Sequence, residues 1–238
     1  MRIIAFGSSH AVGYKLSDVE NSHYDTVSNL AFPSIVANYF NCECKNYAKC
    51  ANPMDQILTD IMAYIPHGHP DDVIILQLPK WPHWFKLITP DNHVHNINNP
   101  DSLNDKGSKY SKALESYMGV LTGDAHWTRI WYVNFFSIMN LLFQHNKKFI
   151  WFFDSYSAEY LEFDTRVNIL PQGLSFQMRD IKKSMPDPAQ YYIPQIYSIY
   201  LEEHCPESVM PGGHYNEIGH KFWAENVLIP AIKERLTN

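Results

Sequence analysis

The sequence has little of several features that mark whole classes of protein. Its 19 Lys and Arg residues stand against 25 Asp and Glu, and no basic cluster offsets the net charge of −6, which argues against a nucleic-acid partner. No run approaches the ~20 apolar residues that a membrane span needs. The apolar run after Met1 is too short for a signal peptide. We therefore expect a cytoplasmic protein without a membrane span.

Cysteine is also scarce and shows no zinc-binding pattern. The four cysteines, at positions 42, 44, 50 and 205, fit no ligand spacing, and reduced thiols of an intracellular protein explain them. Two His-x-His pairs would place both imidazoles on one side of a strand, at His67 and His69 and at His93 and His95. Both pairs lie in polar segments without further ligands, so we interpret them as solvated loops. We expect neither a metal nor another cofactor.

What the chain does contain is enough apolar residues, 45%, for one large α/β domain over residues 1–238. Near-continuous apolar runs are typical of strands buried on both faces of a parallel sheet. We predict strands at 2–6, 44–48, 72–78 and 148–153, with a fifth within 191–200. Helical patterns alternate with them at 27–40, 54–65, 110–121, 125–145 and 216–236, the last bent by Pro230. Long loops or insertions are expected at 86–109 and 154–190.

This alternation predicts a mostly parallel sheet between two helical layers, a three-layer α/β/α sandwich. Ligands of such sheets bind beyond the carboxyl ends of the strands. The first strand ends there in Gly7, Ser8 and Ser9, and a Gly-Gly-His loop near the other end of the chain presents His214 before a helix capped by Asn216. A serine becomes a nucleophile when a base takes its proton. A bare helix cap at Ser8 or Ser9 is the alternative.

These segments carry a resemblance to a known superfamily. Phe6-Gly7-Ser8-Ser9 is similar to the Phe-Gly-Asp-Ser block of the SGNH (GDSL-type) hydrolases. Pro211-Gly212-Gly213-His214, followed by Asn216, Gly219 and His220, is similar to their final Asp-x-x-His block. The run 46–51 resembles their middle block. The resemblance implies a flavodoxin-like sheet, Ser9 as the nucleophile and His214 as its base, and it extends to divergent members encoded by tailed bacteriophages, so a viral origin is compatible with it.

The chain also departs from the family pattern. Pro211 stands where the triad acid is expected, and Ala51 where an oxyanion glycine is expected. No Gly-x-Asn-Asp block follows the strand at 72–78, which leaves Ser9, Ala51, Gln77 and Lys80 as candidate oxyanion donors. Asp154 and Glu217 are candidate substitutes for the acid, against ordinary roles as a turn residue and a first-turn helix charge.

Aromatic residues follow the strand at 72–78 and are candidates for a substrate rim. Trp81 and Trp84 would stack on a sugar or cover an acyl chain, or else pack as a lid. His10 would contact the substrate or close the turn. The sequence thus predicts a serine esterase acting on a small-molecule or carbohydrate ester through an acyl-enzyme. A degenerate binding or structural protein, or an acyltransferase using the same site, is the alternative. The sequence carries no signal for an oligomeric state.

Overall fold

The computed structural model describes residues 1–19, 26–79, 85–88, 94–97, 124–154 and 188–236. At its centre lies a parallel sheet of β1 (Arg2–Phe6), β2 (Glu43–Asn46), β3 (Asp72–Leu78) and β6 (Lys148–Phe153). The strand order β2-β1-β3-β6 is the flavodoxin-like order, in which the chain starts inside the sheet and extends it on both sides.

The remaining elements surround this sheet. They are α1 (Ser9–Val12), α2 (Phe32–Tyr39), α3 (Met54–Tyr64), η1 (Ile65–His67), β4 (Phe85–Ile88), β5 (Val94–Ile97), α5 (Asp124–Gln144), η4 (Pro188–Tyr191), α7 (Tyr197–His204), η5 (Pro206–Ser208), β7 (Val209–Met210), β8 (His214–Tyr215), α8 (Glu217–Trp223), the π-helical η6 (Ala224–Leu228) and α9 (Ile229–Leu236).

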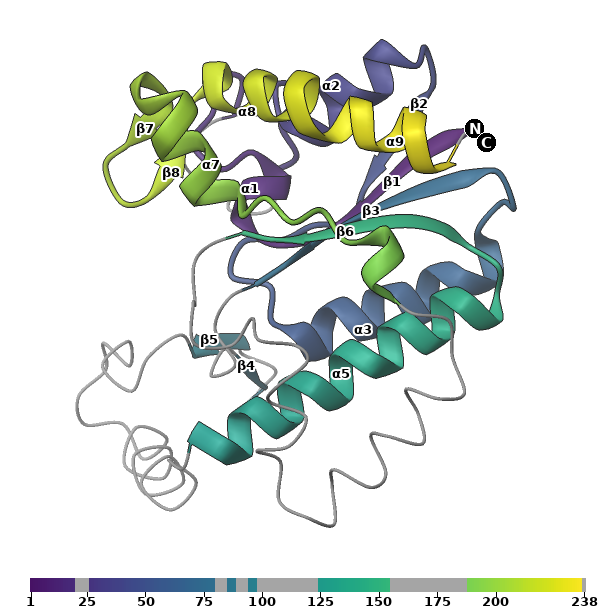
Figure 1. Cartoon of the computed structure of the whole chain (residues 1–238). Coiled ribbons are helices and arrows are strands. Elements are labelled where there is room, and N and C mark those ends of the chain that lie inside the picture. Colours follow the sequence, from purple (N-terminus) through teal and green to yellow (C-terminus); the bar gives the residue numbers. More distant parts are fainter. Residues whose placement is uncertain (20–25, 80–84, 89–93, 98–123, 155–187, 237–238) are drawn as a thin grey trace, which may run out of the picture.

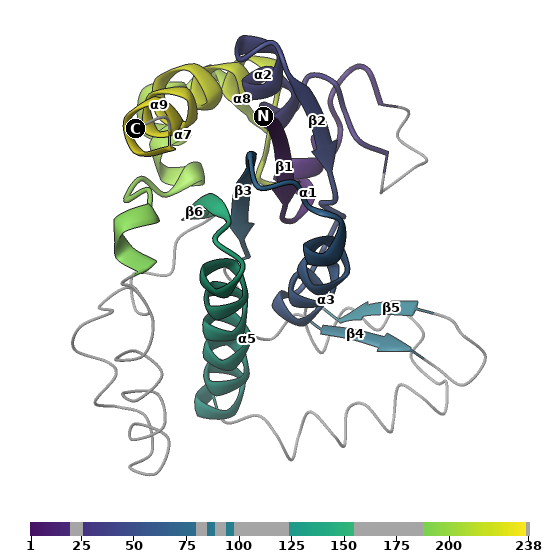
Figure 2. The same ribbon diagram turned by 90° about the vertical axis from the view of Figure 1, so that its right-hand side faces the viewer.

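Helices cover both faces of the sheet and make the sandwich three-layered. In Figure 1, α2, α7, α8 and α9 lie on one face, and α3 and α5 lie on the other. The β4–β5 hairpin lies beside α3 (Figure 2). Successive strand residues alternate between the two layers: Ile3 packs with the α2–α9 side and Ile4 with the α3–α5 side. Burial on both faces explains the near-continuous apolar runs of β1, β3 and β6, whereas the edge strand β2 is only partly buried.

The predictions for single elements had mixed outcomes. The four main strands are confirmed, although β2 begins one residue earlier and ends two residues earlier than expected. The strand predicted within 191–200 is wrong: only Tyr192 pairs with the sheet, through a single bridge to Trp151, and α7 follows. Pro194 interrupts any strand there, and the spacing of Tyr197 and Leu201, both fully buried, suits a helix.

The helix predictions were broadly correct, with different boundaries. The first begins at Phe32 rather than at 27, because Pro33 in its first turn favours a helix start. The helix predicted at 110–121 lies outside the described residues. The final helix is confirmed, and a π-helical segment ends just before Pro230. Proline has no N–H for a regular helical bond, and the wider segment accommodates the break.

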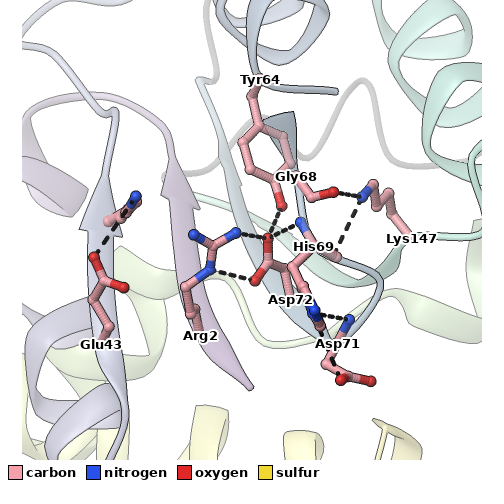
Figure 3. A network of polar contacts seen from close by, with 9 residues as sticks. Arg2, Glu43, Tyr64, Gly68, His69, Asp71, Asp72 and Lys147 are labelled. Carbon is pink, nitrogen blue, oxygen red and sulfur yellow. Dashed lines mark hydrogen bonds and ion pairs between the residues drawn. The ribbon is translucent and has the colours of Figure 1, made fainter. Parts of the chain in front are cut away.

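A buried ion pair joins two strands at the amino end of the sheet (Figure 3). Both guanidinium nitrogens Nε and Nη2 of Arg2 donate to the Asp72 carboxylate at 2.7 Å. The Tyr64 hydroxyl (2.5 Å) and the His69 N–H (2.7 Å) also donate to it. Burial alone would raise the pKa of Asp72, but these donors outweigh it and hold the pKa at about 2.

Within the ranges given above, the structure contains no helix of the length and apolarity that crossing a bilayer requires.

Candidate active site

The residues singled out from the two ends of the chain meet at the carboxyl end of the sheet. Ser9 is the first residue of α1, directly after the turn that ends β1. His214 begins β8 and pairs with Met210 across a three-residue loop. Gly212 and Gly213 in that loop adopt φ values of 88° and 73°, which L-residues rarely adopt. The glycines thus allow the tight hairpin that carries His214.

The two side chains are in contact. His214 Nε2 lies 3.3 Å from Ser9 Oγ although the residues are 205 positions apart. Both side chains are only partly buried, so the hydroxyl is accessible. A contact of this length suits proton transfer from a serine to an imidazole, because such contacts are often loose before a substrate binds.

The other side of the His214 ring lacks the partner that a triad would supply. Its Nδ1 atom is buried and makes no hydrogen bond with any described residue. Burial, and then the nearby positive charge of Lys15, lower the pKa of His214, and the Gly212 carbonyl acts in the opposite direction. His214 is therefore neutral at neutral pH, as a general base must be.

A buried polar network beneath the serine turn occupies two of the predicted site residues. Gln77 Oε1 accepts hydrogen bonds from the N–H groups of Ser8 (3.1 Å) and Ala11 (3.0 Å). Its Nε2 donates to Ser8 Oγ (2.9 Å) and Asp154 Oδ2 (3.2 Å). Gly7 is required here, because a Cβ at that position would lie 2.7 Å from Gln77 Oε1. The side chain of Gln77 thus caps α1 and fixes the turn that presents Ser9.

The same network explains the serine at position 8. The family pattern has an aspartate there, whereas Ser8 Oγ donates to Asp154 at 3.3 Å. A carboxylate therefore lies beside position 8 after all, but it comes from the end of β6. Asp154 is 4% exposed, so its carboxyl group takes its hydrogen bonds from protein donors such as these.

Ala51 lies in the loop that follows β2. The loop is attached to β1 by two hydrogen bonds, from Tyr47 N–H to Ala5 O (2.8 Å) and from Lys49 N–H to Gly7 O (3.3 Å). Ala51 has a φ of 50°, the left-handed conformation that glycine adopts most readily. The backbone at this position thus keeps a glycine-like shape although the residue is alanine.

The remaining candidates are placed as follows. The Glu217 carboxylate accepts a hydrogen bond from Ser17 N–H at 2.7 Å, and neither it nor Asp154 is bonded to His214 Nδ1. His10 is 9% exposed and packs against the His214 ring, at 5.2 Å between centroids. Lys80, Trp81, Trp84 and His93 lie outside the described residues. Asn216 caps α8 through bonds from Ile218 and Gly219, as predicted.

Three residues near the site were not singled out from the sequence. The Tyr14 ring contacts His214 at 5.1 Å, and Lys15 lies over Tyr14 at 5.5 Å. Tyr197 lies behind His10, at 5.1 Å. The only local signal was that Tyr14 and Lys15 follow the serine turn closely, and nothing in the sequence connects Tyr197 to it.

Neither His67 nor His69 belongs to a potential metal site among the described residues, which contain no cluster of three or more suitable ligands. The His69 imidazole nitrogen Nδ1 instead accepts a bond from Asp71 N–H at 3.2 Å.

Solved structures of other proteins share the fold of this chain. A lipolytic protein of the G-D-S-L family from Veillonella parvula aligns over 100% of this chain and 98% of its own, with a TM-score of 0.50 and 14% identity. The chain has the SGNH-hydrolase fold. Esterase EstA from Pseudoalteromonas sp., in a structure inhibited by monoethylphosphonate, aligns over 100% and 99% of the two chains, with a TM-score of 0.54 and 9% identity.

A third similar structure is that of an acetyl xylan esterase, Est2A, from the rumen bacterium Butyrivibrio proteoclasticus. It aligns over 99% of this chain with a TM-score of 0.51 and 10% identity, and this chain spans 64% of its length. No family model and no curated protein matches the sequence. The chain is thus a divergent example of this fold.

Proposed function

We propose that the protein is a serine hydrolase that cleaves an O-acyl ester through an acyl-enzyme. The observation that carries this proposal is the 3.3 Å contact between Ser9 Oγ and His214 Nε2 at the carboxyl end of the sheet. The structural neighbours that are esterases support the same reaction class.

In the first half-reaction Ser9 Oγ attacks the ester carbonyl while His214 Nε2 takes its proton. The carbon–oxygen bond to the leaving alcohol then breaks, and His214 gives that proton to the alcohol oxygen. In the second half-reaction His214 takes a proton from water, whose oxygen attacks the acyl carbon. The acid leaves, and the proton returns to Ser9.

The N–H groups of Ser9 and Ala51 are the proposed oxyanion donors. Ser9 opens α1, and the first N–H groups of a helix have no partner within it. The left-handed conformation of Ala51 supports a role for that backbone amide, because it reproduces the shape of a glycine. Gln77 is a weaker candidate, since its Nε2 already donates to Ser8 and Asp154. Each such donor contributes roughly 10²–10³-fold to turnover.

We propose an acylated carbohydrate or another small ester as the substrate, and Trp81 and Trp84 remain proposed rim residues. Among the structural neighbours, one is an acetyl xylan esterase. Acetylated sugars are therefore the first substrates to assay, beside short p-nitrophenyl esters.

The test is covalent labelling with a fluorophosphonate probe, combined with hydrolysis of p-nitrophenyl acetate. Wild-type protein should be labelled and active, whereas Ser9→Ala should lose labelling and at least about 10³-fold of its activity. Ser8→Ala removes the neighbouring hydroxyl and is the matched control, which should still be labelled. If wild-type protein is neither labelled nor active on any ester of the panel, the proposal is wrong.

A second candidate function is a non-catalytic binding protein that uses the same site. The unpartnered Nδ1 of His214, with Pro211 in place of the acid, is the observation that favours it. Calorimetry distinguishes the two: saturable binding of an acetylated sugar that is recovered unhydrolysed would support the binding protein.

A further inference from the structure

The polar atom behind His214 is the least explained feature of the proposed site. For Nε2 to accept the proton of Ser9, the imidazole must carry its own proton on Nδ1. In a Ser-His-Asp triad the acid accepts a hydrogen bond from that Nδ1–H group. Here Nδ1 is buried and makes no hydrogen bond of regular geometry with a described residue. The Gly212 carbonyl lies near enough to the ring to raise its pKa but does not meet that geometry, and the Asp154 and Glu217 carboxylates are bonded to other groups.

Two further buried polar atoms without partners belong to rings that pack beside or behind the His214 ring. They are His10 Nδ1 and the Tyr197 hydroxyl. The His10 ring lies 5.2 Å from the His214 ring and 5.1 Å from the Tyr197 ring, measured between centroids. A buried polar atom without a hydrogen bond is destabilising, so three such atoms on adjoining rings call for an interaction that the described contacts do not supply.

Aromatic packing alone does not account for a histidine at position 10. His10 lies among the rings of Tyr197, His214 and Tyr215, where a phenylalanine would pack equally well without a buried polar atom. What the imidazole adds is a nitrogen lone pair beside the base.

We propose that His10 is the positioning residue of His214, its neutral imidazole accepting the hydrogen bond from His214 Nδ1–H directly or through one buried water. This inference rests on the proposed esterase function. The Tyr197 hydroxyl completes the arrangement, because a buried water needs two to four polar partners. No proton moves to His10, which holds the tautomer and the orientation of the base.

His10 is suited to this role because it remains an acceptor. Burial, and then the proximity of the His214 and His220 imidazoles, hold the pKa of His10 well below its usual value, so the ring is neutral at neutral pH. Tyr14 and Lys15 also lie beside the pair, and Tyr197, Tyr215 and His220 lie on the side of His10.

The experiment is a double-mutant cycle on the hydrolysis of p-nitrophenyl acetate. His10→Phe keeps the ring but removes the acceptor, and should lower kcat about 10²-fold with KM nearly unchanged, less than the ~10⁴-fold that follows loss of a triad acid. His10→Asn, whose amide oxygen reaches the position of Nδ1, should retain most of the activity. His204→Phe, on an exposed histidine of α7, is the control and should change nothing.

The decisive variant, Pro211→Asp, places a carboxylate at the position where the triad acid of the family is expected. Pro211→Asp should raise kcat at least tenfold in the His10→Phe background and by less than threefold in the wild type, because only the former lacks a positioning group. Equal effects in both backgrounds, or an unchanged kcat of His10→Phe, would overturn the inference. If His10→Phe fails to fold, the cycle is run with His10→Leu, judged by the same criteria.

The outcomes also separate this inference from the function on which it rests. If Ser9→Ala abolishes labelling and activity but His10→Phe does not alter kcat, the esterase function is supported and the positioning role of His10 is wrong. If the wild type shows no hydrolysis, both the esterase function and the positioning role of His10 are wrong.

Discussion

Ala51 adopts a backbone conformation that suits glycine better than alanine. Its φ of 50° brings Cβ close to the backbone, which destabilises a non-glycine residue by roughly 1–2 kcal/mol. Few positions in a fold retain such a conformation unless the surroundings require it. At Ala51 the requirement is the course of the loop that follows β2 and lies against the end of β1.

We predict that Ala51→Gly leaves the protein equally stable or stabilises it by up to about 1 kcal/mol, because relief of the left-handed alanine offsets the greater freedom of glycine in the unfolded chain. Urea denaturation measures the change. Ala37→Gly, inside α2 where Ala37 is 2% exposed, is the matched control and should destabilise by about 1 kcal/mol or more. A clear loss of stability in Ala51→Gly would contradict this account.

His214 determines the pH dependence of the proposed reaction. Only the neutral imidazole accepts the proton of Ser9, so activity falls as pH drops through the pKa of His214. Burial and the charge of Lys15 lower that pKa below the ordinary value. We therefore predict that the acid limb of the kcat/KM profile lies below pH ~6.5.

Replacing Lys15 tests this assignment. Lys15→Met removes a positive charge near the ring, so the acid limb should move to higher pH, and added salt should weaken the difference because Lys15 is exposed. Lys221→Met, on an exposed side chain of α8, is the control. A profile unaffected by Lys15→Met would exclude Lys15 as a cause of the lowered pKa.

At the scale of elements, the serine turn depends on a side chain from a neighbouring strand. Gln77 is fully buried in β3, and its Oε1 atom accepts hydrogen bonds from the N–H groups of Ser8 and Ala11. We predict that Gln77→Leu destabilises the protein by about 2–4 kcal/mol, since it leaves both donors and the Asp154 carboxylate without this partner. Gln56→Leu, on the half-buried Gln56 of α3, whose amide donates to Asp60, should cost less than ~1 kcal/mol.

Denaturation curves and activity together test that prediction. Because the turn carries Ser9, Gln77→Leu should also lower kcat more than Gln56→Leu does at equal temperature. Equal stability of the two variants would show that the network contributes little.

Elements were predictable from the sequence where local pattern decides their structure. The strands at 72–78 and 148–153 bury both faces, so their apolar runs sufficed. The segment 191–200 failed because its tyrosines suit a strand, whereas their burial against α8 selects a helix. In the site, the pairing of Ser9 with His214 followed from family resemblance. The partners of Gln77 and the burial of His10 depend on contacts between distant segments, for which the sequence holds no local signal.

At the scale of the whole molecule, the Asp72 network joins β1, β3 and α3 at the end of the sheet remote from Ser9. The folded-state pKa of Asp72, about 2, lies below the ordinary value of 3.8. Its ionised form is thus favoured by folding, and the stabilisation is full above pH ~4 and is lost as pH falls toward 2. We predict that Asp72→Asn lowers the free energy of unfolding by about 2–4 kcal/mol at pH 7 and flattens its pH dependence below pH 4.

Thermal or urea unfolding between pH 2 and 7 measures this effect. Asp71→Asn, on a side chain 63% exposed, is the control and should retain the wild-type dependence. If Asp72→Asn loses stability at low pH as steeply as the wild type does, groups other than Asp72 cause that loss.

The separation of Ser9 and His214 by 205 positions has a consequence for synthesis on the ribosome. The sheet around β1 and β3 can form early, but the base joins the serine only after β8 has left the exit tunnel. A nascent chain arrested before that point would hold its nucleophile without a base and should not react with a fluorophosphonate. Labelling of Ser9 would then report that the last segment of the chain has docked.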